Sequence, residues 1–259
     1  GLALFATVNP IDFLFGKNWY PISDPPQFGI LPLILGSFLV TLGAVVIAVP
    51  LGIAAAVYVA EVAPVRTKDI LKSGIELLAA IPSIVLGFIG IVTLAPFLKG
   101  VFHLSSGLTA LAGSIMLAFM SLPTIVSIIE DSLNSVPRNY KEGSLALGAT
   151  HWQTIYRVLL PAASSGILAA IMLGIGRVIG ETMAVLMITG NAAVMPTSLL
   201  QPVRTLTATI AAEMGEAVSG SQHYFSLYAI GIVLFIISFI INLSADMFLH
   251  RNAKKLRKK

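Results

Sequence analysis

Long apolar segments separated by polar stretches set the pattern of this chain. Five of them are continuous runs rather than periodic stripes, and they cover Ile30–Ala60, Ile75–Phe97, Leu108–Ile129, Ala162–Ile188 and Phe225–Leu249. At a rise of about 1.5 Å per residue, each can cross a hydrocarbon core of about 30 Å. The pattern predicts an all-α, polytopic membrane protein. Kinks are expected at the prolines within or near these segments, namely Pro50, Pro82, Pro96 and Pro123.

A further apolar stretch, residues 1–8, is too short to span a bilayer, and a polar loop follows it at residues 9–29. We expect this stretch to be the end of a truncated first helix rather than the remnant of a signal peptide. It then brings the bundle to about six transmembrane helices. We treat residues 1–259 as a single transmembrane domain.

The basic residues predict the orientation of this bundle. Twelve of the 16 Lys and Arg residues fall on one side, and they are Arg66, Lys68, Lys72, Arg138, Lys141, Arg157, Arg251, Lys254, Lys255, Arg257, Lys258 and Lys259. Lys17, Lys99 and Arg204 fall on the other side, and Arg177 lies inside a segment. By the positive-inside rule the first set is cytoplasmic, and so is the C-terminus.

Two long loops follow from this orientation. The cytoplasmic loop covers residues 131–160 and the external loop covers residues 189–224. In the external loop Leu206, Ile210 and Met214 lie four residues apart, which predicts a short amphipathic helix. That helix either lies on the outer membrane face or packs on the bundle as an ordinary loop helix.

Composition supports the membrane assignment and excludes other classes. Hydrophobic residues make up 56% of the chain and charged residues only 11%, against about a quarter in soluble domains. The net charge of +4 does not indicate nucleic-acid binding, because the basic residues sit at helix ends. With no cysteine, thiol chemistry and cysteine metal sites are impossible, and we expect no metal or other cofactor.

The cytoplasmic loop is predicted to hold two short helices around a glycine. Asn134 or Ser135 can cap the first helix, Pro137 fits its first turn, and Gly148 can end it. Thr150 and Gln153 have the spacing of a capping box that starts the second helix.

In this second helix one apolar face is expected, made of Trp152, Ile155, Tyr156 and Leu159. An ordered, exposed helical hairpin with an apolar face either engages a partner or packs on its own bundle.

Two opposite charges lie inside the fourth apolar segment. Arg177 and Glu181 are four residues apart, which would place them on one face of a helix. A charged residue in a bilayer normally faces the bundle interior or a water-filled path. The pair is therefore either a buried ion pair or part of a path for an oxyanion, which a guanidinium binds in bidentate fashion. Gly176 and Gly180 would let another helix approach closely beside it.

The cytoplasmic loop resembles the EAA loop of bacterial ABC importer permeases. The residues that carry the resemblance are Glu142-Gly143-Ser144-Leu145-Ala146-Leu147-Gly148 and, after nine further residues, Val158-Leu159-Leu160-Pro161. Gly143 and Ser144 stand where the family has two alanines. The resemblance implies a type I importer permease bundle whose loop 131–160 docks the ATPase subunit, with Glu142, Gly148 and Trp152 as coupling residues.

The fourth segment resembles the PstC-type permease of the phosphate importer. The stretch is Gly176-Arg177-Val178-Ile179-Gly180-Glu181-Thr182-Met183-Ala184, followed by Gly190-Asn191. It implies that Arg177 and Glu181 lie on the phosphate path in a prokaryotic inner membrane. It also implies three partners: a second, PstA-type permease, PstB-type ATP-binding subunits and an external PstS-type phosphate-binding protein. A sulfate or molybdate permease and a PstA-type subunit remain alternatives.

Two other classes of function fit the residues less well. A secondary transporter would need several intramembrane carboxylates, and only Glu181 is well inside a segment. A membrane enzyme would need clustered chemistry, but His103, His151, His223 and His250 are scattered. The chain also lacks the Gly-x-x-x-x-Gly-Lys-Ser/Thr loop, so ATP must be hydrolysed by another chain.

Overall fold

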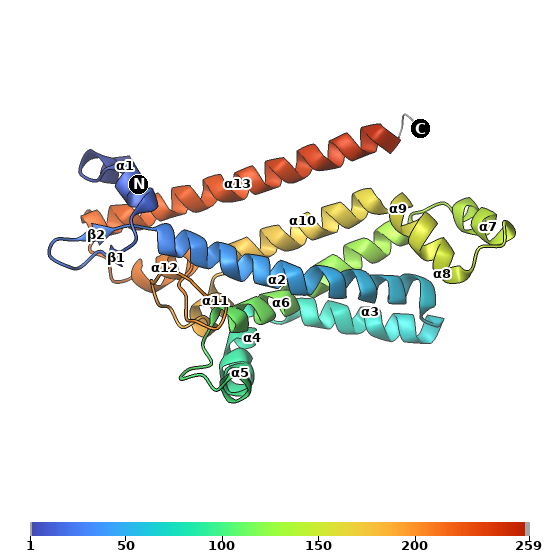
Figure 1. Cartoon of the computed structure of the whole chain (residues 1–259), viewed down its shortest axis with the longest axis horizontal. Helices are drawn as coiled ribbons and strands as arrows, with labels where there is room; N and C mark the ends of the chain where they lie inside the picture. Colours follow the sequence, from blue (N-terminus) through green and yellow to red (C-terminus); the bar gives the residue numbers. More distant parts are fainter. Residues whose placement is uncertain (1, 257–259) are drawn as a thin grey trace. The chain divides into compact units, whose positions relative to one another are not determined.

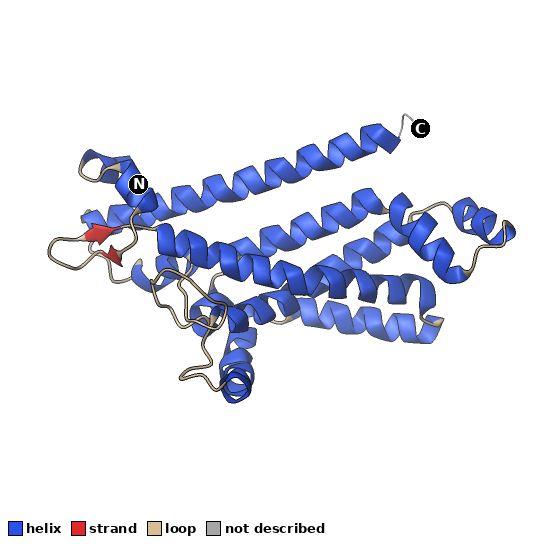
Figure 2. Cartoon of the chain, viewed as in Figure 1, coloured by secondary structure: helices blue, strands red, loops and turns tan. Residues whose placement is uncertain are grey.

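A computed structural model describes residues 2–256 of the chain and the side chains of residues 4–244. Nearly all of its regular structure is helical, as Figure 2 shows, which confirms the predicted all-α class. The exception among the described residues is an antiparallel pair, β1 (Trp19–Tyr20) and β2 (Gln27–Phe28). The side chains of the basic tail used to predict orientation lie outside the described residues; they are Arg251, Lys254, Lys255, Arg257, Lys258 and Lys259.

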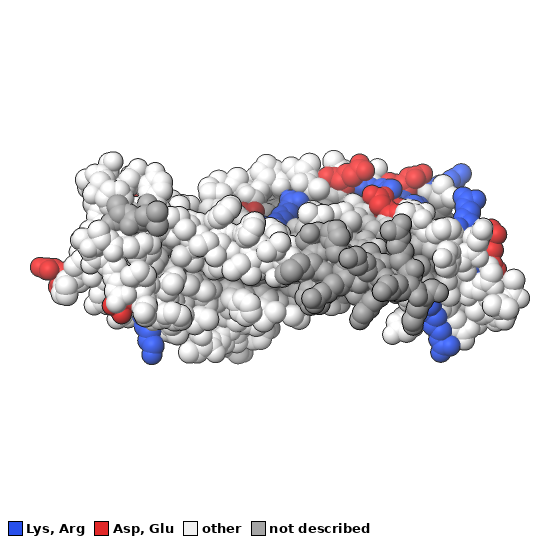
Figure 3. Space-filling model, turned by 90° about the horizontal axis from the view of Figure 1, so that it is seen from above, with Lys and Arg blue, Asp and Glu red and all other residues white. Residues whose placement is uncertain are grey.

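Four helical stretches in the described part of the chain are long and apolar enough to cross a membrane. They are α2 (Leu31–Val57) with the π-helical turn η2 (Tyr58–Val62), α4 (Ser83–Ile89) with η3 (Gly90–Leu94) and α5 (Ala95–Phe102), α6 (Ala110–Asn134), and α13 (Gln222–Leu256). A fifth span is formed if residues His151–Ala162 and α10 (Ser164–Gly180), bent by 70°, count as one. Figure 3 shows wide areas without charged side chains, as lipid contact requires.

Two predicted segments are broken where the sequence suggested continuity. The segment expected from Ile75 begins inside α3 (Val65–Ala80), and the membrane helix starts only at Ser83. Ile81 is extended, because a residue before proline is kept out of the helical region. The fourth segment stops at Gly180 and resumes as α11 (Met183–Ile188).

The N-terminal region also differs from expectation. The stretch 1–8 holds a short 3₁₀ turn, η1 (Leu2–Ala6), and the loop after it contains α1 (Pro10–Phe15) and the strand pair. Among the expected kink sites, α2 and α6 run through Pro50 and Pro123, whereas Pro82 precedes α4 and Pro96 lies in the first turn of α5.

The chain forms two compact units. Unit 1 comprises Gly1–Val45, Pro82–Ala118 and Val178–Ile240. Its apolar core includes Phe13, Trp19, Leu33 and Leu227, and α12 (Leu206–Glu213) inserts Leu206 into it. Because the first four residues of α12 are all buried, this loop helix packs on the bundle rather than lying on the membrane face. α11 packs on α4 and α12.

A polar cluster ties the loops of unit 1 together. The Glu213 carboxylate accepts hydrogen bonds from Trp19 Nε1 at 3.1 Å and from His223 Nε2 at 2.9 Å, and it pairs with Arg204. Trp19 is on β1 and His223 is in the first turn of α13. A single carboxylate thus joins β1 to the region around α12, from Arg204 before this helix to His223 after it.

Unit 2 comprises Val46–Ile81, Phe119–Arg177 and Ile241–Lys259. Within it Ile125 of α6 fills the space left by two glycines. A Cβ added at Gly52 would lie 2.6 Å from Ile125 Cγ2, and one at Gly174 would lie 2.8 Å from Ile125 Cδ1. Of the two glycines predicted to permit a close helix approach beside Arg177, Gly180 meets no described atom within 4 Å, and a Cβ at Gly176 would be in ordinary contact with Asn242 Oδ1 at 3.7 Å. The tight approach is at Gly174.

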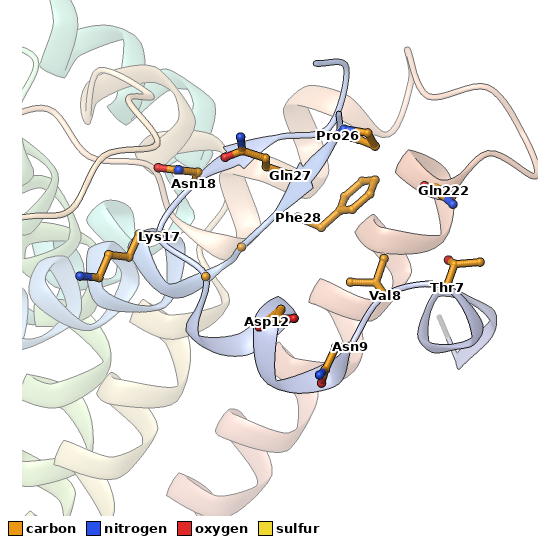
Figure 4. Close-up of a pocket in the computed structure, with 12 residues that line it drawn as sticks. Thr7, Val8, Asn9, Asp12, Lys17, Asn18, Pro26, Gln27, Phe28 and Gln222 are labelled. Atoms are coloured by element: carbon orange, nitrogen blue, oxygen red, sulfur yellow. The ribbon is translucent and has the colours of Figure 1, made fainter. Parts of the chain in front are cut away.

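A pocket of about 470 Å³ lies beside the N-terminal segment of unit 1 (Figure 4). Phe28 and Val8 supply apolar surface, and the rest of the lining is mostly polar. It has one carboxylate, Asp12, and one ammonium, Lys17, which extends away from Asp12 in Figure 4. With balanced charge and no arginine, the pocket does not have the character of an oxyanion site.

The crossing of Gly16 and Gly29 in unit 1 gives a test of this fold. A Cβ added at Gly29 would lie 2.6 Å from Gly16 Cα, so the two backbones cross with no room for a side chain. We expect Gly29→Ala to destabilise the protein by about 1–3 kcal/mol, as overpacking does. The measurement is the thermal unfolding midpoint in detergent. Gly100→Ala is the control, because that helical site in α5 has open space and alanine favours helix there.

Candidate functional site

The predicted docking loop folds as two helical segments around a glycine, and Figure 1 shows them projecting from the ends of α6 and α10. The first is α7 (Arg138–Ala146). The second is α8 (His151–Thr154), which continues through η4 (Ile155–Leu159) and α9 (Leu160–Ala162). We call residues 138–162 the α7–α9 hairpin.

Gly148 ends α7 as the sequence predicts. Its φ of +84° is in the left-handed region, where glycine carries no Cβ penalty. Its N–H donates to Leu145 O at 2.9 Å, and the next N–H, of Ala149, donates to Ser144 O at 3.2 Å. These two bonds form a Schellman motif, which satisfies the carbonyls released at the helix end.

Thr150 starts α8 with the predicted capping box. Its hydroxyl accepts from Gln153 N at 3.3 Å, and Gln153 Oε1 accepts from Thr150 N at 2.9 Å. Ser144 and Thr154 then join the two helices through their hydroxyls, 3.0 Å apart. The predicted cap of α7 is wrong: Pro137 occupies the N-cap, and Asn134 bonds back to Glu130 on α6.

The predicted single apolar face of the second helix is split between two faces. Ile155 and Leu159 are buried, but the side chains of Trp152 and Tyr156 are 66% and 75% exposed. The π-helical turn η4 widens the spacing, so residues four apart share a face while neighbours in the predicted stripe diverge. Leu147, 91% exposed, extends the outer apolar surface to the glycine turn.

Glu61, in η2 at the end of α2, holds both arms of the hairpin. Its carboxylate pairs with Lys141 of α7, and its backbone carbonyl lies 3.2 Å from His151 Nε2 of α8. Glu142 is exposed, and it lines a cavity of about 580 Å³ together with Glu61, Arg138 and Lys141. The hairpin therefore has an inner side bound by polar contacts and an outer side of exposed aromatic residues.

Arg177 lies near the end of α10 and is exposed, although its neighbours on the helix are apolar. Its Nη1 donates to Thr124 Oγ1 of α6 at 3.0 Å, the one partner of this side chain in the described part of the chain. An exposed arginine on an apolar helix has to face water or another protein in a membrane.

Glu181 is not on the helix of Arg177, so the predicted shared face is wrong. α10 ends at Gly180, and the Glu181 carboxylate accepts from Met183 N at 3.1 Å and Ala184 N at 3.3 Å, the first N–H groups of α11. This cap satisfies the donors that a new helix start releases. Glu181 thereby stabilises the break between the two helices.

Sequence reasoning missed the threonines of α12 that surround this break. Thr207 Oγ1 donates to the backbone carbonyl of Glu181 at 2.9 Å, and Thr205 caps α12. Both line a cavity of about 10 Å³ beside Glu181, together with Ser37 and Thr41. A space of this size can hold a single water. The alternation Thr205-x-Thr207-x-Thr209 was the signal available in the sequence.

Residues 48–258, and so most of the chain, match the family described as binding-protein-dependent transport system inner membrane component. The chain belongs to that family. The chain is therefore a membrane subunit of a transport system and not an enzyme. This membership accounts for the apolar helices.

Individual relatives agree with the family assignment. The chain is 46% identical to the probable ABC transporter permease protein YqgH of Bacillus subtilis, over 90% of this chain and 75% of the relative. It is 39% identical to the phosphate transport system permease protein PstC of Mesorhizobium japonicum, over 88% and 75%. A PstC protein of Xylella fastidiosa is 33% identical over 95% and 80%.

Solved structures share the fold of this family member. A chain of the MetNI methionine ABC transporter in an inward-facing conformation matches with a TM-score of 0.64 at 21% identity, over 86% of this chain and 94% of that chain. A chain of a bacterial alginate ABC transporter, solved in complex with an alginate-bound periplasmic protein, matches with a TM-score of 0.69 at 14% identity, over 96% and 85%. The architecture is that of ABC importer permeases.

The glycine turn of the hairpin is testable by a matched pair of substitutions. Gly148→Ala forces a left-handed conformation on a residue with a Cβ, at a cost of about 1–2 kcal/mol. Gly143→Ala, inside α7 with open space around it, should instead favour the helix. Hydrogen exchange measured by mass spectrometry should be faster at residues 147–150 in the first variant and unchanged or slower in the second. Equal exchange in both would contradict the Schellman cap.

Proposed function

We propose that this chain is the PstC-type permease subunit of an ATP-driven phosphate importer. The observation that carries the proposal is Arg177, a guanidinium exposed on an apolar helix and steadied by Thr124. Its planar fork suits a phosphate oxyanion, and one hydroxyl partner leaves further N–H donors for that anion. Relatives named phosphate transport permease support the substrate.

The path itself needs a second subunit. Arg177 is exposed in the isolated chain, so in a bilayer another surface has to keep lipid away from it. A homologous PstA-type permease, facing α10, would enclose a water-filled path. Phosphate would be delivered by a PstS-type binding protein on the external side, and Glu181 would hold the break that follows Arg177.

Energy would enter through the α7–α9 hairpin. Its outer side presents Leu147, Trp152 and Tyr156, three large side chains that an isolated soluble surface would rarely leave exposed together. A PstB-type ATPase subunit would cover them and the adjoining turn at Gly148, and Glu142, which lines the cavity beside Glu61, would act in coupling from there. This places the hairpin and the C-terminus in the cytoplasm, as the positive-inside rule indicates. Closure of the ATPase would move the hairpin and bias the bundle between two conformations.

Substitution of Arg177 tests the phosphate path. In cells without their own high-affinity importer, supplied with this chain and its partners, Arg177→Gln should lower phosphate uptake by about tenfold or more. A hydrogen bond to a charged group contributes about 1.5–3 kcal/mol, and glutamine, which is uncharged, would lose this contribution to phosphate binding. Arg177→Lys should recover only part of the uptake, because an ammonium lacks the fork.

The matched control is Arg66→Gln, which removes the same charge from an exposed position on α3. All variants are compared at equal membrane levels, with ATPase activity measured alongside. Normal uptake by Arg177→Gln would remove this residue from the path. Uptake of sulfate or molybdate, but not phosphate, by the wild type would keep the permease and overturn the substrate.

The docking surface can be tested separately in detergent. Trp152→Ala should raise the Kd for the ATPase subunit by about tenfold or more, because buried tryptophans at interfaces commonly contribute 2 kcal/mol or more. Tyr20→Ala is the control, since Tyr20 is also an exposed aromatic residue but belongs to β1 of unit 1. Equal affinities for both variants would show that the outer side of the hairpin is not the docking surface.

A further inference from the structure

Helix α3 has sixteen residues and none of them is buried. Three of its large apolar side chains are exposed in this chain, Val65 by 77%, Ile70 by 72% and Leu77 by 70%, whereas Leu71 and Ile75 are half-buried. Gly74, at its middle, has no described atom near the position of a Cβ. Apolar packing supplies most helix stability in proteins, and within this chain α3 has only this half-buried contribution from it.

A buried carboxylate also holds this helix. Glu130 of α6 is 1% exposed, and its two oxygens pair with Lys68 Nζ at 3.1 Å and Lys72 Nζ at 3.2 Å. The two lysines lie one turn apart on α3, so both reach the same acid. The Lys72 ammonium donates a hydrogen bond to Glu130, and this bond raises the pKa of Lys72. A buried carboxylate persists only when it is paired and hydrogen-bonded in this way.

The same carboxylate also reaches the base of the hairpin. Asn134 Nδ2 donates to Glu130 Oε1 at 3.0 Å. Asn134 is the last residue of α6, and α7 begins four residues later at Arg138. A second connection lies just before α3 in the sequence, where only residues 62–64 separate Glu61 from the first residue of α3. Glu61 contacts both arms of the hairpin. Polar contacts thus join α3 to the end of α6 that precedes the hairpin, and they join the turn that precedes α3 to the hairpin itself.

We propose that Glu130 is the positioning residue that fixes helix α3 to the base of the α7–α9 hairpin, so that a movement of the hairpin carries α3 with it. The second half of this inference rests on the proposed function of the hairpin. Hydrogen bonds and ion pairs can transmit such a movement, because they depend on direction and so fix the orientation of α3 relative to α6. Apolar contacts depend little on direction. Since α3 leads through Ile81 and Pro82 into α4, a membrane helix follows the element that Glu130 positions.

The chain contains no cysteine, so pairs of spin labels can be introduced without background. One pair joins Ser73 of α3 to Leu173 of α10, and a second joins Asn139 of α7 to Leu173; all three positions are exposed. Distances are measured by pulsed electron resonance in the assembled transporter, without nucleotide and with a non-hydrolysable ATP analogue. In Glu130→Gln without nucleotide, the Ser73–Leu173 distribution should broaden to about twice its wild-type width, as for a helix that opens locally.

Asp131→Asn is the control, because it removes an acid from the adjacent, exposed position of α6. Should Glu130→Gln fail to fold, the double substitution Lys68→Gln with Lys72→Gln removes the same contacts from the exposed side and should broaden the distribution equally. An unchanged distribution in either folded variant overturns the inference. When the nucleotide analogue is added to Glu130→Gln, the Asn139–Leu173 distance should still change as in the wild type, and the Ser73–Leu173 distance should no longer change.

Failure of the proposed function has a different signature. In that case the Asn139–Leu173 distance in the wild type would not respond to the nucleotide analogue at all. The width of the Ser73–Leu173 distribution without nucleotide decides the role of Glu130 independently, because it involves neither ATP nor transport.

Discussion

Backbone groups released at helix ends have no water to bind in a bilayer, and this constraint governs how the chain can change direction. The break after Gly180 is closed by the Glu181 carboxylate, which accepts from two N–H groups of α11. Thr205 closes the start of α12 in the same manner. A side chain that accepts hydrogen bonds at a break is therefore a structural requirement, and a charged one can meet it. Its presence in a membrane segment does not by itself identify a partner for Arg177.

Arg177 follows a different logic from Glu181. Its environment within the chain provides one hydroxyl, from Thr124, and leaves the side chain exposed. The Glu181 carboxylate finds its hydrogen-bond partners on the backbone of its own chain. The guanidinium of Arg177 has five N–H donors, and one hydroxyl does not supply acceptors for all of them. The two charges that look like a pair in sequence thus have separate roles: one completes the fold, and the other is suited to what the chain meets outside itself.

Local signals predicted well wherever the determining atoms are close in sequence. Gly148 and the Thr150–Gln153 box adopt the predicted caps, because each motif involves residues within five positions of one another. Continuity of apolar runs was a poorer guide: Pro82 separates α3 from α4 although the residues on both sides are apolar. The split between Ile155 and Tyr156 depends on a π-helical turn, which a 3.6-residue period cannot reveal.

Contacts that define the sites over long distances in sequence could not be predicted. Glu130 and Lys68 are 62 positions apart, and an acid at a helix end has many basic residues to choose from. The charge pattern predicts a cytoplasmic side, but it does not predict which charged residues pair. Only the fold shows that one acid binds two lysines and an amide.

The hairpin needs two kinds of surface if it is to relay movement, and its sequence separates them. Exposed Trp152 and Tyr156 suit a partner, because apolar burial supplies affinity without demanding a fixed angle. Glu61 and Glu130 lie on the side of the chain's own helices, where hydrogen bonds and ion pairs are sensitive to direction as well as distance. If a partner protein moved the side with Trp152 and Tyr156, the polar contacts on the other side would keep their orientation. For that reason a displacement at the hairpin would reach α3 as a defined motion and not as a loosening of the bundle.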